Sequence, residues 1–189
     1  MQQIKKPISL IHKTITDMTL KNLVYDYNQS KKIYDLIEEK SKENGTFIEN
    51  TCFIWVKYQY RLKGDNPKSE PRTMTKCIMN GSNYKLKHKE VVEIIPAYTP
   101  NELYQHMPKV ITIIRGNGLD EHREYYNLTT YHDITSIAYG DLDNDENILF
   151  LFMEKTIKRA IYKMVVALLE HGFKLSKSCD FEAQYKFTN

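Results

Sequence analysis

The sequence predicts a single α+β domain in which an antiparallel sheet, made of a β-hairpin plus a β-meander, carries packed N-terminal and C-terminal helices. Three observations predict this class. Helical periodicity is confined to the two ends of the chain and one short central segment. The residues between are mostly runs of β-branched and aromatic side chains, which are typical of strands. A length of 189 residues with 41% apolar residues suits one domain with its own core.

Residues 19–44 form the predicted N-terminal helical segment. Two apolar stripes at helical spacing support it. The polar Asn28-Gln29-Ser30 between them predicts a break into two helices. Gly45 provides the stop signal, because glycine tolerates the left-handed conformation that ends many helices.

The main body, residues 45–173, begins with strands. Residues 53–60 read as one long aromatic strand. Asn80-Gly81 is the strongest hairpin signal, because a type I′ turn needs positive φ at both central positions. We therefore expect residues 72–79 and 82–89 to pair across this turn. A further strand, residues 91–95, ends at Pro96.

The second half of the chain alternates between helix and sheet signals. Thr99-Pro100-Asn101-Glu102 is a capping box that opens a short helix to about Met107. Four successive strands then predict an antiparallel meander, at residues 110–114, 125–131, 134–139 and 148–153. The last helix runs from about Lys155 to His171 and ends at Gly172. The tail, residues 174–189, has alternating apolar residues and predicts an edge strand.

Cysteine use and hydropathy predict a cytoplasmic protein without a membrane partner. Cys52, Cys77 and Cys179 are odd in number and far apart, so we expect three core thiols in a reducing compartment. The first residues lack the apolar core of a signal peptide. The longest apolar run, residues 164–169, is far shorter than a membrane span.

Two pairs of segments carry a family resemblance. CFIWV at 52–56 is followed by IIPAYT at 94–99, and LFLFM at 149–153 is followed by LLEHGF at 168–173. Together they resemble small uncharacterised accessory proteins of phages and prophages of gut bacteria. The resemblance spans residues 45–173. It implies a bacterial host cytoplasm and a counter-defence role, but no activity and no functional residues.

Catalytic and metal motifs are incomplete in this chain. His12-Lys13-Thr14 is half of a two-histidine phosphoesterase motif, and no second half exists. Residues 141–146 resemble the start of a calcium loop, but Glu146 replaces the required glycine. Gly116-Asn117-Gly118 lacks the third glycine of a dinucleotide fingerprint. We expect no metal and no cofactor.

The enzyme question stays open, with the sequence leaning against an enzyme. That hypothesis would regain weight if the fold gathered His88, His122 or His132 in one pocket with Glu124 or Asp133, because such pairs support acid–base chemistry.

Positive charge is concentrated in residues 57–89. This segment holds nine Lys and Arg against two acids, a net charge of +7, although the whole chain carries only +3. The predicted hairpin places Lys76 opposite Lys85 and Arg72 opposite Lys89, with Lys87 on the same face. Like charges across a ladder cost stability, on the order of a few tenths of a kcal/mol. The face is therefore either solvated surface that prevents edge pairing or an anion-binding surface.

We predict ligand-binding residues on and around this face. Tyrosines would stack on bases and cations would hold phosphate. Two arginines flanking residues 116–118 form a weaker second group. The predicted residues are Lys57, Tyr58, Tyr60, Arg61, Arg72, Lys76, Lys85, Lys87, Lys89, Arg115 and Arg123.

The leading hypothesis is a non-enzymatic protein that binds an anionic, nucleotide-like small molecule, for example to sequester a nucleotide signal of bacterial immunity. One alternative is a protein–protein inhibitor that docks on an acidic host protein. Another is a nucleic-acid-binding protein, whose affinity would fall steeply with salt. The sequence leaves open the ligand, the oligomeric state, including a homo-oligomer, and whether the site lies within one chain.

Overall fold

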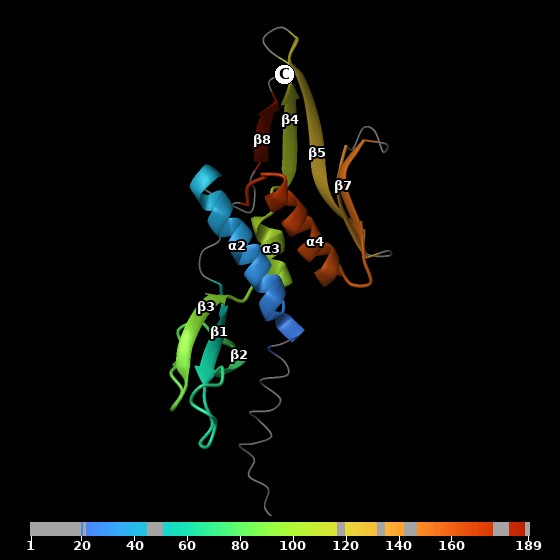
Figure 1. Cartoon of the computed structure of the whole chain (residues 1–189). Helices are drawn as coiled ribbons and strands as arrows, with labels where there is room; N and C mark the ends of the chain where they lie inside the picture. Colours follow the sequence, from blue (N-terminus) through green and yellow to red (C-terminus); the bar gives the residue numbers. More distant parts are fainter. Residues whose placement is uncertain are drawn as a thin grey trace, which may run out of the picture. The chain divides into compact units, whose positions relative to one another are not determined.

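Residues 20, 22–44, 51–116, 120–131, 135–141, 147–175 and 182–187 are described by the structure, a computed structural model. Helices α2, α3 and α4 and two mostly antiparallel sheets, of three and five strands, make up this part of the chain (Figure 1). The predicted α+β class with an antiparallel sheet is confirmed. Among the described helices, none combines the length and the apolar character that a membrane crossing requires.

The chain divides into two compact units. The first contains residues 1–31 and 51–99, and the second contains residues 32–50 and 100–189. The boundary falls within helix α2, Tyr27–Asn44. The expectation of a single domain stays a prediction.

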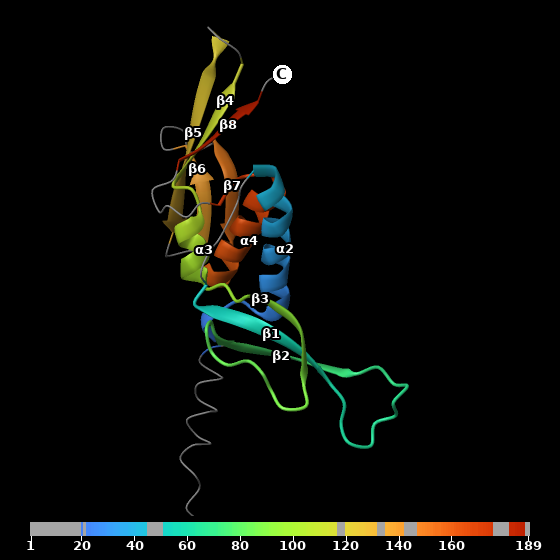
Figure 2. The ribbon, with the colours of Figure 1, turned by 90° about the vertical axis from the view of Figure 1, so that its left-hand side faces the viewer.

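The first unit is built on a three-stranded antiparallel sheet. Strand β1, Phe53–Tyr60, lies between β2, Arg72–Met79, and β3, Glu90–Pro96 (Figure 2). Both faces of β1 contribute to the core, because Trp55 and Val56 point to opposite sides of the sheet and both are buried.

The predicted hairpin of residues 72–89 is wrong. The Asn80-Gly81 turn exists, with Gly81 at φ +83, but β2 pairs with β1 and residues 82–89 form no strand. Lys76 and Arg72 therefore lie opposite Val56 and Tyr60 instead of facing other cations. The physical reason is apolar pairing. Strand β1 offers β2 a row of large side chains, whereas residues 82–89 would have offered like charges.

The predicted break in the N-terminal helix occurs earlier than expected, at residues 24–26. Asp26 caps α2, because the Gln29 N–H donates to its Oδ1 (2.8 Å) and its own N–H donates to Gln29 Oε1 (3.3 Å). Tyr25 leaves the helix path altogether, and its N–H donates to the Tyr98 carbonyl (2.9 Å). Asn28 and Ser30 therefore belong to the first turn of α2.

The second unit contains the predicted meander. Strands β4, Val110–Arg115, β5, His122–Tyr131, β6, Ser136–Gly140, and β7, Ile148–Met153, pair antiparallel in chain order. Strand β8, Glu182–Phe187, adds to β4 in parallel, so the predicted edge strand in the tail is confirmed.

Helices cover one face of the five-stranded sheet. Helix α4, Ile157–Glu170, contacts β6, β7 and α3, Pro100–His106 (Figure 2). Thr156 caps α4, because its side chain accepts from the Arg159 N–H. The buried Tyr139 donates its hydroxyl hydrogen to the Pro108 carbonyl (2.6 Å). The core of this unit thus lies between β6 and α4.

Candidate functional site

A cleft of about 540 Å³ opens within the three-stranded unit. One wall comes from β1 and β2, and the other from the start of α2. Its lining residues are Asp26, Tyr27, Asn28, Trp55, Lys57, Thr73 and Thr75. A cleft of this size can hold a ligand as large as a nucleotide, because small-molecule sites measure roughly 300–1,000 Å³.

The strand register brings the sheet residues of the cleft together. Lys57 lies opposite Thr75 on β2 and opposite Glu93 on β3, so the three side chains share one face. Trp55 is two residues earlier on the same face, and its indole N–H donates to the Tyr25 carbonyl (3.1 Å). This hydrogen bond ties the segment preceding α2 to the sheet.

Lys57 is the central cation of the cleft. Its ammonium lies 5.8 Å from the centroid of the Tyr27 ring, a cation–π contact. Lys57 forms no ion pair with any residue that the structure describes. A half-buried ammonium held by an aromatic ring, with no carboxylate bound to it, is suited to accept an anionic group.

Glu93 does not neutralise Lys57 by direct pairing. The Glu93 carboxylate accepts a hydrogen bond from the Tyr27 hydroxyl and pairs with Lys31 (3.2 Å). The Tyr27 hydrogen bond is the main reason that the pKa of Glu93 is lowered, and Lys31 and Lys57 lower it further. Glu93 is therefore a fixed anion that orients Tyr27 and Lys31 at the edge of the cleft.

Neutral and acidic groups complete the cleft. Thr73, Thr75 and Asn28 are exposed and present hydroxyl and amide groups that can bond a sugar or a base edge. Asp26 uses Oδ1 for the Gln29 N–H, and a carboxylate oxygen can also accept from a ribose hydroxyl. Tyr27 is the more accessible of the two aromatic rings that line the cleft, because Trp55 is only 5% exposed.

Two of the predicted aromatic residues are already occupied. Tyr58 is 1% exposed and donates its hydroxyl hydrogen to the Tyr84 carbonyl (2.7 Å), so the expectation that it stacks on a ligand is wrong. Burial raises the pKa of Tyr58. Tyr60 has the Lys89 ammonium 4.8 Å from its ring centroid. Lys89 therefore covers Tyr60 on the sheet face away from the cleft.

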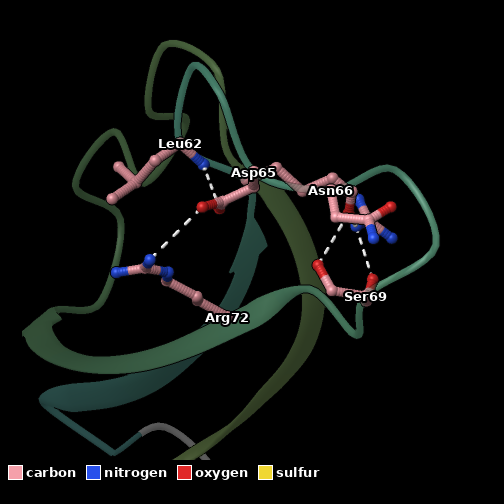
Figure 3. Close-up of polar contacts among 6 residues, drawn as sticks. Leu62, Asp65, Asn66, Ser69 and Arg72 are labelled. Carbon is pink, nitrogen blue, oxygen red and sulfur yellow. Dashed lines mark hydrogen bonds and ion pairs between the residues drawn. The ribbon is translucent and has the colours of Figure 1, made fainter.

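Arg61 and Arg72 hold the loop between β1 and β2. The Arg61 guanidinium donates to the carbonyls of Asn66 (3.2 Å) and Ser69. Arg72 pairs with Asp65 (3.3 Å), which also accepts from the Leu62 N–H (Figure 3). Both arginines therefore stabilise the conformation of this loop.

The remaining predicted lysines do not form a common face. Lys76 is half-buried opposite Val56, while Lys85 and Lys87 are exposed on the irregular segment after β2. None of the three lines the cleft. The predicted face of opposed lysines therefore does not exist.

Arg115 and Arg123 lie in the second unit. Arg115 pairs with Glu124 (3.2 Å) and Arg123 with Glu121 (2.9 Å). Both arginines are more than half exposed, with side-chain exposures of 58% and 53%. These surface ion pairs give no sign of a joint anion site.

Catalytic and metal constellations are not assembled in the described part of the chain. No group of three His, Cys, Asp or Glu side chains there could hold a metal ion. His88 belongs to the first unit, whereas His122 and Glu124 belong to the second, and none of them lines the cleft. His12, His132, Asp133 and most of the acidic 141–146 turn lie outside the described residues.

The cysteine prediction is partly wrong. Cys77 is buried, and its burial raises its pKa to about 11. Cys52 is exposed, because it directly precedes β1. Cys179 lies outside the described residues.

Sequence reasoning found Lys57 but missed the rest of the cleft. Thr73 and Thr75 line the cleft because β2 pairs with β1, and the predicted hairpin did not include that pairing. Asp26 could have been found from its spacing to Gln29, which is typical of a capping box and predicts a helix start at Tyr27.

Comparison with family models, with curated proteins and with solved structures gives no significant match to the chain. The resemblance to phage and prophage accessory proteins therefore stays a prediction.

Proposed function

We propose that this protein binds an anionic, nucleotide-like small molecule in the cleft between α2 and the three-stranded sheet, without transforming it. Lys57 would hold the phosphate, Tyr27 would stack on the base, and the Asp26 and Asn28 side chains would bond the sugar or the base edge. The observation that carries this proposal is the Lys57 ammonium, which lies inside a nucleotide-sized cleft and has no ion-pair partner among the described residues.

The charge of the surrounding unit supports an anionic ligand. Residues 51–99 hold nine Lys and Arg against four Asp and Glu. Such an excess raises the local concentration of anions and their rate of association, and salt screens this effect. Asp26 opposes a phosphate placed beside it, whereas Glu93 near Lys57 is already paired with Lys31 and bonded by Tyr27, so we place the phosphate at the Lys57 end and the ribose at the Asp26 end.

The biological setting that we propose follows from the resemblance alone. A phage or prophage protein that binds a nucleotide signal in the bacterial cytoplasm would lower its free concentration and thereby act against host defence. Sequestration needs tight binding and no turnover.

A melting-shift screen tests the proposed ligand class. The probes are adenosine and guanosine 5′-monophosphates, 3′,5′-cyclic AMP and the two parent nucleosides. We expect at least one nucleotide to raise the melting temperature, because a ligand that binds only the folded state stabilises it. The matching nucleoside should bind at least about ten-fold more weakly. It lacks the phosphate, and a charge-assisted hydrogen bond to that group contributes about 1.5–3 kcal/mol.

The control is a pair of charge-matched variants. Lys57→Gln should abolish the shift, and Lys87→Gln, which removes an exposed lysine away from the cleft, should retain it. The absence of a shift with every nucleotide at about millimolar concentration, or a shift that Lys57→Gln retains in full, would contradict the proposal.

Exposed lysines favour a second candidate function, docking on an acidic host protein. Lys63, Lys68, Lys85 and Lys87 are exposed and form no ion pair with a described residue. A charge-reversed Lys85→Glu/Lys87→Glu variant would then lose a partner captured without nucleotide, while Lys57→Gln would keep it. Recovery of nucleic acid instead of one protein would indicate the nucleic-acid alternative.

A further inference from the structure

The four edge strands of the two described sheets differ in how they are protected against pairing. Strands β2 and β8 carry two charged residues each, and β3 carries two glutamates and Pro96. Strand β7 has the sequence ILFLFM and carries none. Charges and proline on an edge strand prevent unwanted pairing with other chains. Strand β7 is the edge of these four without charge or proline, and its register shift against β6 lies at its start, so residues 150–153 form a regular, uncharged edge.

The side chains of β7 form part of an exposed apolar surface. Ile148, Leu151 and Met153 are 46%, 45% and 60% exposed. Met153 lies opposite Ser136, and Ser136 opposite Tyr131, which is 50% exposed, so these residues share the sheet face that α4 does not cover. The same residues line a shallow cleft of about 210 Å³, which shows that the apolar surface is continuous.

We propose that β7 pairs antiparallel with β7 of a second copy of this chain, forming a two-fold dimer with one continuous ten-stranded sheet. Strand β7 has β6 on one side, and no described residue pairs with its other side. Pairing would satisfy the backbone groups of that side and cover Leu151 and Met153.

The sequence of β7 is self-complementary in such a pair. With Leu151 opposite Leu151 of the second copy, Phe152 lies opposite Phe150, so the regular part of the strand pairs apolar with apolar side chains. Beyond the regular part of the strand, Lys155 of one copy lies near the start of β7 of the other, where the Asn147 carbonyl accepts from the N–H of Asp141 on the β6 side (3.0 Å). Lys155 thus approaches the acidic Asp141 of the other copy at both ends of the pair, which is attractive.

A second copy explains these features better than an unrelated peptide does. An isologous contact must bring each end of the strand against the opposite end of its twin. Asp141 lies beside the start of β7 and Lys155 follows its end, as that symmetry favours, while Glu154 between the strand and Lys155 is paired with Arg159 and Lys163 of its own chain. Assembly through β7 also stops at two copies, because each chain has one free β7 edge and the dimer uses both.

The first test is the mass of the protein in solution, measured by light scattering on a sizing column and by sedimentation velocity at 2 to 200 μM chain (about the range in which dimers of moderate affinity form). We expect the protein to be a dimer, with a larger dimer fraction at higher concentration. Leu151→Lys should be monomeric, because each copy would place a lysine opposite its own twin at the centre of the pair.

The matched control is Val92→Lys. Val92 lies on the edge strand β3 and is 45% exposed, as Leu151 is. The substitution therefore introduces the same lysine at the same exposure, away from β7. This variant should remain a dimer. Far-ultraviolet circular dichroism and the urea midpoint of both variants separate loss of the dimer from loss of the fold. A monomeric wild-type protein at 200 μM (about the top of the range above), or a folded Leu151→Lys dimer, would overturn the proposal.

A cysteine placed on the two-fold axis tests the register directly. In an antiparallel pair, directly opposed Cα atoms lie about 4.5–5.5 Å apart, within the range that a disulfide spans. We expect Leu151→Cys to form a 151–151 disulfide on mild oxidation, identified by peptide mass spectrometry, while Val92→Cys forms no 92–92 link. A dimer in which position 151 fails to cross-link would show that another surface holds the copies together.

Discussion

At the residue scale, the alternation of side chains along β1 separates binding from packing. Lys57 and Tyr58 are neighbours in the sequence, yet one lines the cleft and the other is buried on the opposite sheet face. The sequence marks both residues as candidates for ligand binding. It does not show which of them faces a ligand, because that depends on which elements cover each face of the sheet. The Tyr84 segment covers one face, and the start of α2 flanks the other.

Tyr58→Phe tests the packing role. Removing the hydroxyl leaves the Tyr84 carbonyl without this donor, so we expect a loss of about 1 kcal/mol in the free energy of unfolding, measured by urea denaturation. Nucleotide affinity should not change. Tyr60→Phe is the control, because its hydroxyl bonds no described residue and its ring still contacts Lys89. Equal losses in the two variants would contradict the assignment.

Glu93 gives the first unit a pH-dependent stability. Its pKa is lowered in the folded state, so the ionised carboxylate stabilises the fold above the ordinary glutamate pKa of about 4.3. This stabilisation is lost as the pH falls through the lowered value. We expect Glu93→Gln to be about 1 kcal/mol less stable than the wild type at pH 7, and this difference to shrink as the pH is lowered through the acidic range.

The comparison requires urea midpoints of both proteins at pH 7 and through the acidic range. Glu70→Gln serves as the control, since Glu70 is exposed and forms no ion pair with a described residue. A Glu93→Gln difference that stays constant as the pH is lowered would show that the carboxylate contributes by packing alone.

At the element scale, local signals determine where elements begin and end but not which strands pair. The start of α3 at Pro100 and the meander β4–β7 follow from turn and cap signals that nearby residues supply. The Asn80-Gly81 turn is also present, but its usual consequence is not, because β1 competes successfully for β2. The predicted pairing of residues 72–79 with 82–89 produced a basic face that does not exist. The cleft depends on the pairing of β1 with β2 instead.

Thr156 provides a test at this scale. Its side-chain oxygen accepts from the Arg159 N–H (3.3 Å) and satisfies one donor at the start of α4. We expect Thr156→Ala to lower the free energy of unfolding by about 1 kcal/mol, and Thr156→Ser to restore most of it. Both values come from chemical denaturation followed by circular dichroism. A serine variant as unstable as the alanine variant would show that the methyl group, not the cap, matters.

At the scale of the whole molecule, the excess of positive charge and the uncharged edge strand lie in different units. The excess of nine cations over four acids lies in residues 51–99, while the uncharged edge strand β7 lies in the second unit. This division suggests that one unit binds the ligand and the other joins two copies. Composition already shows the charge asymmetry, but the edge position of β7 depends on strand order.

Calorimetric titration of the most stabilising nucleotide into three proteins tests the central claim most directly. We expect one site per chain in the wild type, an affinity at least about ten-fold lower for Lys57→Gln, and a change of less than about three-fold for Lys85→Gln/Lys87→Gln. All three should melt alike without ligand. If the double variant loses binding and Lys57→Gln retains it, the exposed lysines and not the cleft hold the anion.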